Sequence, residues 1–267
     1  MSSEPASLTI NPNGLLNSLG NSLQATVNLV ALALRASAPE SAEALRLPST
    51  TINFEFSTQP PWSKPQAQDK FRTWAISNGF RDAVEHANLL LEDANKVLSI
   101  WEKSKDKAGL ISVSELSAVM EGKSFHRMGQ PDKLDHLRRR HSIDLDSGLQ
   151  RHLESINNAR NCLVHRQGVV TERDLNGGSH MVVEWRKFRA LMQSGSNESE
   201  LKLGEPVGAD ATLVLRVVDD RKEFGLGETV RFDEQEFADV VSGIYSFAMD
   251  LVRKVWLASP DGSGVQR

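Results

Sequence analysis

Cysteine and long apolar runs are what this chain most clearly lacks. Its 267 residues include a single cysteine, Cys162, which excludes a disulfide framework or a multi-cysteine metal site within one chain and favours a reducing compartment. The most apolar stretch, 23–36, is interrupted by four polar residues and is too short and too polar to span a bilayer. The first five residues lack the charged region of a signal peptide. These features predict a soluble cytoplasmic protein with no membrane partner.

The chain also lacks an excess of positive charge. It contains 31 Lys and Arg against 35 Asp and Glu, a formal net charge of −4, which excludes whole-molecule electrostatic binding of nucleic acid. One local basic run stands out at 133–141. Two interpretations of it remain open, a nucleic-acid patch and an ordinary solvated helix face.

The sequence shows no signature of a cofactor-binding site or a metal site. There is no glycine-rich loop of the kind that cradles phosphates. His136, His141 and His152 have no cysteine or carboxylate at metal-ligand spacing. We therefore expect no cofactor and no metal site.

Apolar residues at spacings of three and four predict most of the fold as helix. The predicted helices cover 14–36, 66–103, a short segment near 115–120, a basic helix from about 132, 147–165 with Asp146 or Ser147 as its cap, and a last helix capped by Asp233. Glu236, three residues after Asp233, completes a capping box. The five tryptophans are interpreted as core or interface anchors.

After Gly168 the pattern changes to alternation, which is typical of strands. We predict a hairpin of 169–175 and 181–191 around a turn at 176–178, further strands at 212–218 and 229–232, and one isolated strand at 52–56. The fold class is mainly α with a small antiparallel β-sheet (α+β). The predicted organisation is an N-terminal helix and loop (1–63), a helical core (64–168), hairpins with a final long helix completing the same domain (169–258) and a flexible tail (259–267).

The segment with the clearest chemical content is the end of the helix at 147–165, which reads Arg160-Asn161-Cys162-Leu163-Val164-His165, with Gly168 just beyond. A histidine with a pKa near neutrality can accept or donate a proton in RNA strand cleavage, and an arginine can bind the phosphate. On an ideal helix Arg160 falls within the apolar stripe, so it needs a partner or a wet cleft. Asn161 and His165 share one face, where the amide is expected to orient the imidazole.

This Arg–polar–x–x–x–His pattern near a helix end resembles the signature of the HEPN superfamily (higher eukaryotes and prokaryotes nucleotide-binding). The resemblance covers about residues 66–168. It implies a HEPN-like helical bundle and a metal-independent endoribonuclease with Arg160, Asn161 and His165 as catalytic residues. It also implies an RNA substrate, a homodimer in which two motifs line one cleft, a role as a toxin or antiphage-defence effector, and a cognate antitoxin or regulatory protein.

Two alternatives stay open beside it. The spacing recurs at Arg81–His86, which is interpreted as solvated surface. In the other alternative Arg160 pairs with an acidic residue of the long helix and His165 caps the helix end. The chain is then a catalytically inactive helical module for dimerisation or partner binding.

Overall fold

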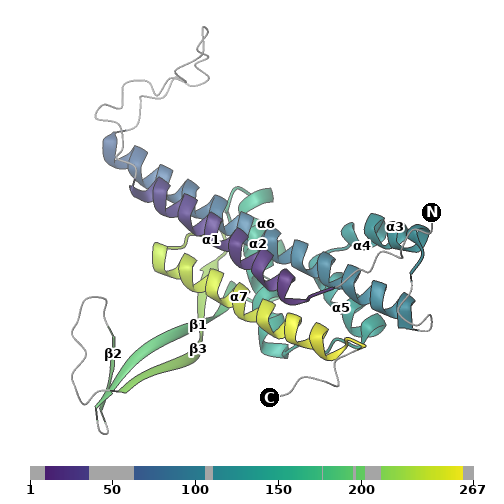
Figure 1. The fold of residues 1–267 in the computed structure, drawn as a ribbon. Helices are drawn as coiled ribbons and strands as arrows, with labels where there is room; N and C mark the ends of the chain where they lie inside the picture. Colours follow the sequence, from purple (N-terminus) through teal and green to yellow (C-terminus); the bar gives the residue numbers. More distant parts are fainter. Residues whose placement is uncertain are drawn as a thin grey trace.

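The computed structural model describes residues 10–35, 63–105, 111–175, 177–194, 197–201 and 212–260. Within them the protein is mainly helical, with one small antiparallel sheet and a long C-terminal helix (Figure 1). The predicted fold class is confirmed. The strand predicted at 52–56 and residues 261–267 of the tail lie outside the described residues.

The elements follow the predicted order closely. The helices are α1 (Asn13–Arg35), α2 (Lys64–Lys105), α3 (Val113–Glu121), α4 (Lys123–His126), α5 (Gln130–His141), α6 (Ser147–His165) and α7 (Glu234–Leu257). The strands are β1 (His180–Ser194), β2 (Asn197–Glu200) and β3 (Thr212–Gly225), and a 3-10 helix occupies Glu172–Asp174. Asp146 is the cap of α6, and Asp233 forms the predicted capping box with Glu236.

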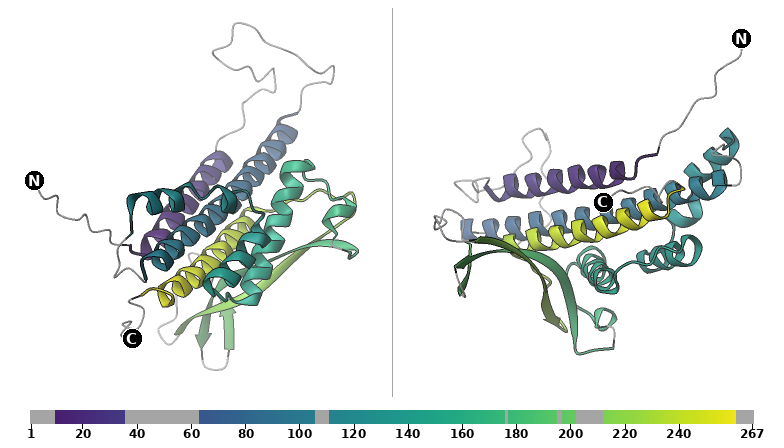
Figure 2. Two further views of the ribbon diagram at one scale, coloured as in Figure 1. Left: turned by 90° about the vertical axis from the view of Figure 1, so that its right-hand side faces the viewer. Right: turned by 60° about the horizontal axis from the view of Figure 1, so that its bottom comes forward.

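Three long helices form the centre of the molecule. α2 and α7 pack side by side, α1 covers one side of this pair, and α6 and the sheet lie on the other (Figure 2). The predicted stripe of α2 is buried from Ile76 to Leu98. Gly79 interrupts that stripe because the helices approach closely there: a Cβ at this position would overlap the side chain of Val30 and lie 3.0 Å from that of Phe237. The residue that weakens α2 locally is therefore what admits α1 and α7.

An aromatic cluster joins the sheet to the helices. Phe232 stacks on Phe80 of α2 with ring centroids 4.7 Å apart, and it meets Trp185 of β1 and Phe224 of β3 edge-on. Phe80 and Trp185 are among the largest fully buried side chains. This cluster holds the base of the sheet against the bundle.

The strand pairing differs from the prediction. The sheet order is β2-β1-β3, and β1 pairs antiparallel with β3 from His180–Gly225 to Gln193–Thr212. The predicted strands 169–175 and 229–232 are wrong: Val169 and Thr229 form only an isolated bridge, and a 3-10 helix follows Val169. Alternation in such short segments marks one buried side but does not select a strand.

No helix among the described residues combines the length and the apolar character needed to cross a bilayer.

Candidate functional site

The end of α6 is set by local chemistry. Asp146 accepts a hydrogen bond from the backbone N–H of Leu149 at 2.9 Å and starts the helix. At the other end the amides of Arg166 and Gly168 both donate to the carbonyl of Cys162, each at 3.0 Å. Gly168 has φ +77°, a conformation that favours glycine after a helix. His165 is thereby the last residue of α6.

Arg160 lies half-buried between α6 and α2. Its Nη1 donates to Oδ1 of Asn161 at 3.2 Å, and its Nη2 lies 3.6 Å from Oε2 of Glu85. Its Nε is buried and has no hydrogen-bond partner among the described residues. The charge thus has the acidic partner on the long helix that the non-catalytic alternative requires.

His165 lies on the exposed surface at the end of the same helix. Among the described residues no hydrogen bond or ion pair joins it to another side chain. Asn161 contacts Arg160 instead, so the expectation that this amide orients the imidazole does not match the observed contact. Arg160 and His165 are five residues apart, which places them about 140° apart around an α-helix. One chain does not bring the two side chains together.

Arg166 anchors the residues that follow the motif, and the sequence analysis missed it. Its guanidinium forms an ion pair with the buried Asp174, which also accepts from the backbone N–H (2.8 Å) and the hydroxyl (2.9 Å) of Thr171. Burial alone would raise the pKa of Asp174, but these hydrogen bonds and Arg166 hold it below its ordinary value. Burial and the nearby Asp174 raise the pKa of the Cys162 thiol. The Thr171–Asp174 spacing, that of a capping box, was the available signal.

The second Arg–x4–His segment lies on α2. Arg81 is exposed and its Nε lies 3.6 Å from Oδ1 of Asp82, as expected for a solvated surface residue. Glu85 belongs to this segment and is the ion-pair partner of Arg160. The second segment therefore supplies the acidic partner of Arg160.

The basic run on α5 is only partly a solvated face. Lys133 is buried, and its Nζ lies 2.7 Å from Oε1 of Glu92, which also contacts Nδ1 of His126 at 3.0 Å. Burial alone would raise the pKa of Glu92, but these two hydrogen bonds hold it below its ordinary value. Lys133 is therefore unavailable to a phosphate backbone, and the interpretation of the whole run as a nucleic-acid patch is wrong for this residue.

The C-terminal part of α5 also contains both a buried basic side chain and exposed ones. His141 contacts Oδ1 of Asn95 at 3.1 Å through its Nε2, and burial lowers its pKa to about 4. Arg138, Arg139 and Arg140 are exposed but lie against Gln150, Asp135 and Glu102 respectively. Only these three cations of the run face solvent.

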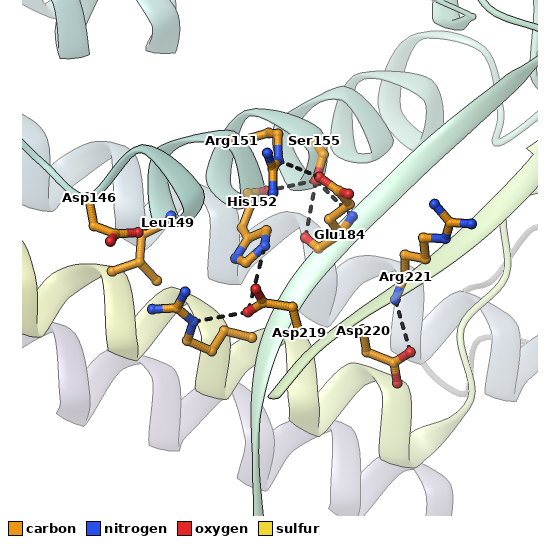
Figure 3. A network of polar contacts seen from close by, with 10 residues as sticks. Asp146, Leu149, Arg151, His152, Ser155, Glu184, Asp219, Asp220 and Arg221 are labelled. Carbon is orange, nitrogen blue, oxygen red and sulfur yellow. Dashed lines mark hydrogen bonds and ion pairs between the residues drawn. The ribbon is translucent and has the colours of Figure 1, made fainter. Parts of the chain in front are cut away.

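Ser155, His152 and Asp219 meet where α6 crosses the sheet (Figure 3). The Ser155 hydroxyl contacts the carbonyl of His152 at 2.8 Å and accepts from the backbone N–H of Glu184 at 2.9 Å. Neither ring nitrogen of the buried His152 has a hydrogen-bond partner among the described residues, and Nε2 lies 3.9 Å from Asp219. Burial lowers the pKa of His152. No hydrogen bond joins the His152 imidazole to the Ser155 hydroxyl, so these residues do not form a nucleophilic triad. Their contacts connect α6 to the sheet.

Two surface hollows lie away from the motif. One of about 440 Å³ lies between α1 and α7 near Trp256, and one of about 430 Å³ lies beside Phe224 and Arg231. Neither is lined by Arg160 or His165. Within the described ranges no three His, Cys, Asp or Glu side chains are grouped so that they could hold a metal ion.

Among known proteins, no protein-family model, no curated protein and no solved structure matches this chain.

Proposed function

We propose that the protein is a HEPN-like, metal-independent endoribonuclease that acts in the cytoplasm as a toxin or antiphage-defence effector, under the control of a cognate antitoxin or regulatory protein. One observation carries the proposal. The Arg160–Asn161 pair lies on the helix whose last residue, His165, is exposed and makes no described side-chain contact. Metal-free phosphodiester cleavage uses an imidazole that can exchange protons and a cation that can stabilise the phosphate charge.

The chemistry balances without a metal or a water molecule. His165 accepts the proton of a ribose 2′-hydroxyl as its oxygen attacks the adjacent phosphorus. The new O–P bond forms while the bond to the 5′-oxygen breaks, and an imidazolium returns a proton to that leaving oxygen. The products are a 2′,3′-cyclic phosphate and a 5′-hydroxyl. Arg160 stabilises the added negative charge, and Asn161 holds Arg160.

We propose a homodimer as the active form. Arg160 and His165 diverge by about 140° on one helix. A two-fold axis near the ends of α6 would place two of each residue around one groove. One histidine would then act as base and the other as acid. Glu85 is exposed, and its 3.6 Å separation from Arg160 exceeds a hydrogen-bond distance, so a phosphate can compete for the guanidinium.

The Arg160–Glu85 ion pair also favours a second candidate, a catalytically inactive helical module for dimerisation or partner binding. In that case the arginine serves to join α6 to α2 and His165 has no chemical role.

Cleavage of a labelled RNA by the purified full chain separates the two. We expect His165→Ala and Arg160→Ala each to lower the rate by about 100- to 10,000-fold, as loss of a general acid–base typically does. Asn161→Ala should lower it less, because the amide positions rather than reacts. Addition of a chelator should leave the wild-type rate unchanged. His86→Ala is the matched control from the other copy of the spacing and should be nearly silent.

Three results would contradict the choice of site, the mechanism and the ribonuclease activity in turn. Loss of cleavage in His86→Ala but not in His165→Ala would show that the other copy is the site. Inhibition by the chelator would exclude the metal-free mechanism. A dimer in light scattering, with no cleavage and equal bacterial growth for wild type and His165→Ala, would favour the interaction module.

A further inference from the structure

Two aromatic side chains near the start of α2 are exposed, unlike the buried aromatic cluster at the base of the sheet. Trp74 is 61% exposed and Phe71 is 43% exposed. Their rings stack on each other with centroids 5.9 Å apart and planes 19° apart. Of the two predicted roles for the tryptophans, core anchor and interface anchor, the first is therefore wrong for Trp74 and the second stays a prediction. An exposed stack of two rings presents a planar apolar surface to solvent.

This surface lies on the same side of α2 as the Arg160 contact. Trp74, Asn78, Arg81 and Glu85 follow one another at spacings of four, three and four, so they form one stripe along the helix. Glu85 contacts Arg160 of α6, whereas Gly79 faces α1 and α7. Trp74 thus lies on the α6 side, about 16 Å along the helix axis from Glu85.

The contacts made by α6 indicate its direction relative to α2. Its first turns lie beside α5, where Gln150 contacts Arg138 and the neighbouring Arg140 contacts Glu102 near the C-terminal end of α2. Ten residues later Arg160 has reached Glu85. The end of α6 at His165 is therefore displaced from Arg160 toward the end of α2 that carries Trp74.

We propose that Trp74, backed by Phe71, stacks an unpaired base of the RNA whose phosphate Arg160 binds. The inference rests on the proposed function and identifies the subsite that selects single-stranded substrate. Aromatic rings bind every base through its π-face, and a duplex cannot present an unstacked base. Arg81, on the same stripe, lies between the base subsite and the phosphate subsite and is exposed.

The charges along the stripe shape the expected binding. Arg81 and Arg160 are offset by Asp82 and Glu85, which lie 3.6 Å from them. The RNA therefore neutralises few charges here, and its affinity should depend only shallowly on salt. Stacking rather than phosphate contact should provide most of the selectivity.

The test measures binding apart from cleavage. The full chain carrying His165→Ala is titrated into a labelled 12-nucleotide oligouridine, and into a duplex of equal length, by fluorescence anisotropy. Adding Trp74→Ala should raise the Kd for the single strand about tenfold, and Trp74→Phe should restore most of the affinity. Duplex binding should be weak and unchanged by either substitution. Leu32→Ala on α1, at a side chain 67% exposed, is the matched control and should have no effect.

Other outcomes would contradict the stacking subsite or separate it from the ribonuclease activity. An unchanged Kd in Trp74→Ala, no binding of the single strand by the His165→Ala chain, or equal loss of duplex binding would overturn the stacking subsite. So would a change of oligomeric state in Trp74→Ala, which would make the surface a protein interface. Cleavage by wild type that persists with unchanged KM in Trp74→Ala would leave the ribonuclease and remove the subsite. Trp74-dependent binding without any cleavage would leave the subsite and remove the ribonuclease.

Discussion

The two halves of the β1–β3 ribbon share one sequence pattern but differ in their surroundings. At the base, Met181, Val183 and Trp185 of β1 are buried beneath α6 and α7. In the outer half, which we call the arm (188–193 of β1 paired with 212–217 of β3), apolar residues also alternate and share one face. This face is opposite to that of the base, because Phe188 follows Trp185 by three residues in a continuous register. Those of the arm that are exposed are Phe188, Leu213, Leu215 and Val217. Figure 1 shows the ribbon extending away from the helices.

The difference teaches that alternation selects a face but does not bury it. A strand directs every second side chain to one side, and burial then requires a second layer. Helices supply that layer on one face of the base, whereas the apolar side chains of the arm are on the opposite face and stay exposed. A ribbon of two strands, extended at its tip only by the four residues of β2, gains little stability in water without a covering layer. The free energy of unfolding should therefore depend on the base and hardly on the arm.

The largest effect should come from the aromatic cluster that joins base and bundle. Phe80 is fully buried and stacks on Phe232. Phe80→Ala should lower the free energy of unfolding by about 3–5 kcal/mol, because it removes buried apolar surface and leaves a cavity. Urea unfolding followed by circular dichroism measures the loss. A loss below about 1 kcal/mol would show that the base is not packed as described.

A smaller effect concerns acid stability of the helical body, through His141. Burial lowers the pKa of this residue to about 4, opposed by Glu102 and reinforced by Arg140 and His136. Above 6.5, the ordinary pKa of a histidine side chain, the imidazole is neutral in both the folded and the unfolded state. Between pH 6.5 and 4 the unfolded chain binds a proton that the folded chain does not, so stability falls as the pH falls. This contribution should reach up to about 3 kcal/mol near pH 4.

Unfolding curves of wild type and His141→Gln at about pH 7.5, 5.5 and 4 test the contribution. The variant should lose less stability on acidification, while other groups still titrate in both chains. If the free energy of unfolding fell equally with pH in wild type and His141→Gln, the contribution of His141 would be contradicted.

The smallest effect should come from the arm. Leu215 is 68% exposed, so Leu215→Thr, which keeps a strand-forming residue, should change the free energy of unfolding by less than about 0.5 kcal/mol. Val183→Thr is the matched control on the buried base and should cost about 1–2 kcal/mol, because it buries a hydroxyl. A large loss at Leu215, or a change in oligomeric state, would show that the arm is covered in solution.

The helices were predictable because their signals are local. The α2 stripe, the Asp146 cap and the Asp233–Glu236 capping box each lie within a few turns of the element they define. The strand partners were not predictable in the same way. The alternation at 169–175 has the period of a strand, but Glu172–Asp174 is a 3-10 helix with a Thr171–Asp174 capping box, and Arg166 pairs with Asp174. The partner of most of β1 is β3, which begins only at Thr212, too far along the chain for a short turn to indicate the pairing.

The sequence by itself determined the helix ends, the side of each helix that is apolar, and the presence of Arg160, Asn161 and His165 near one terminus, because spacing and capping act between residues a few positions apart. Only the tertiary structure decided that Glu85 meets Arg160, that Asp174 anchors Arg166, and that Trp74 stays exposed while Trp185 is buried. The physical reason is that ion pairing and burial depend on which helix faces come together, and those faces are brought together by packing across residues far apart in the chain.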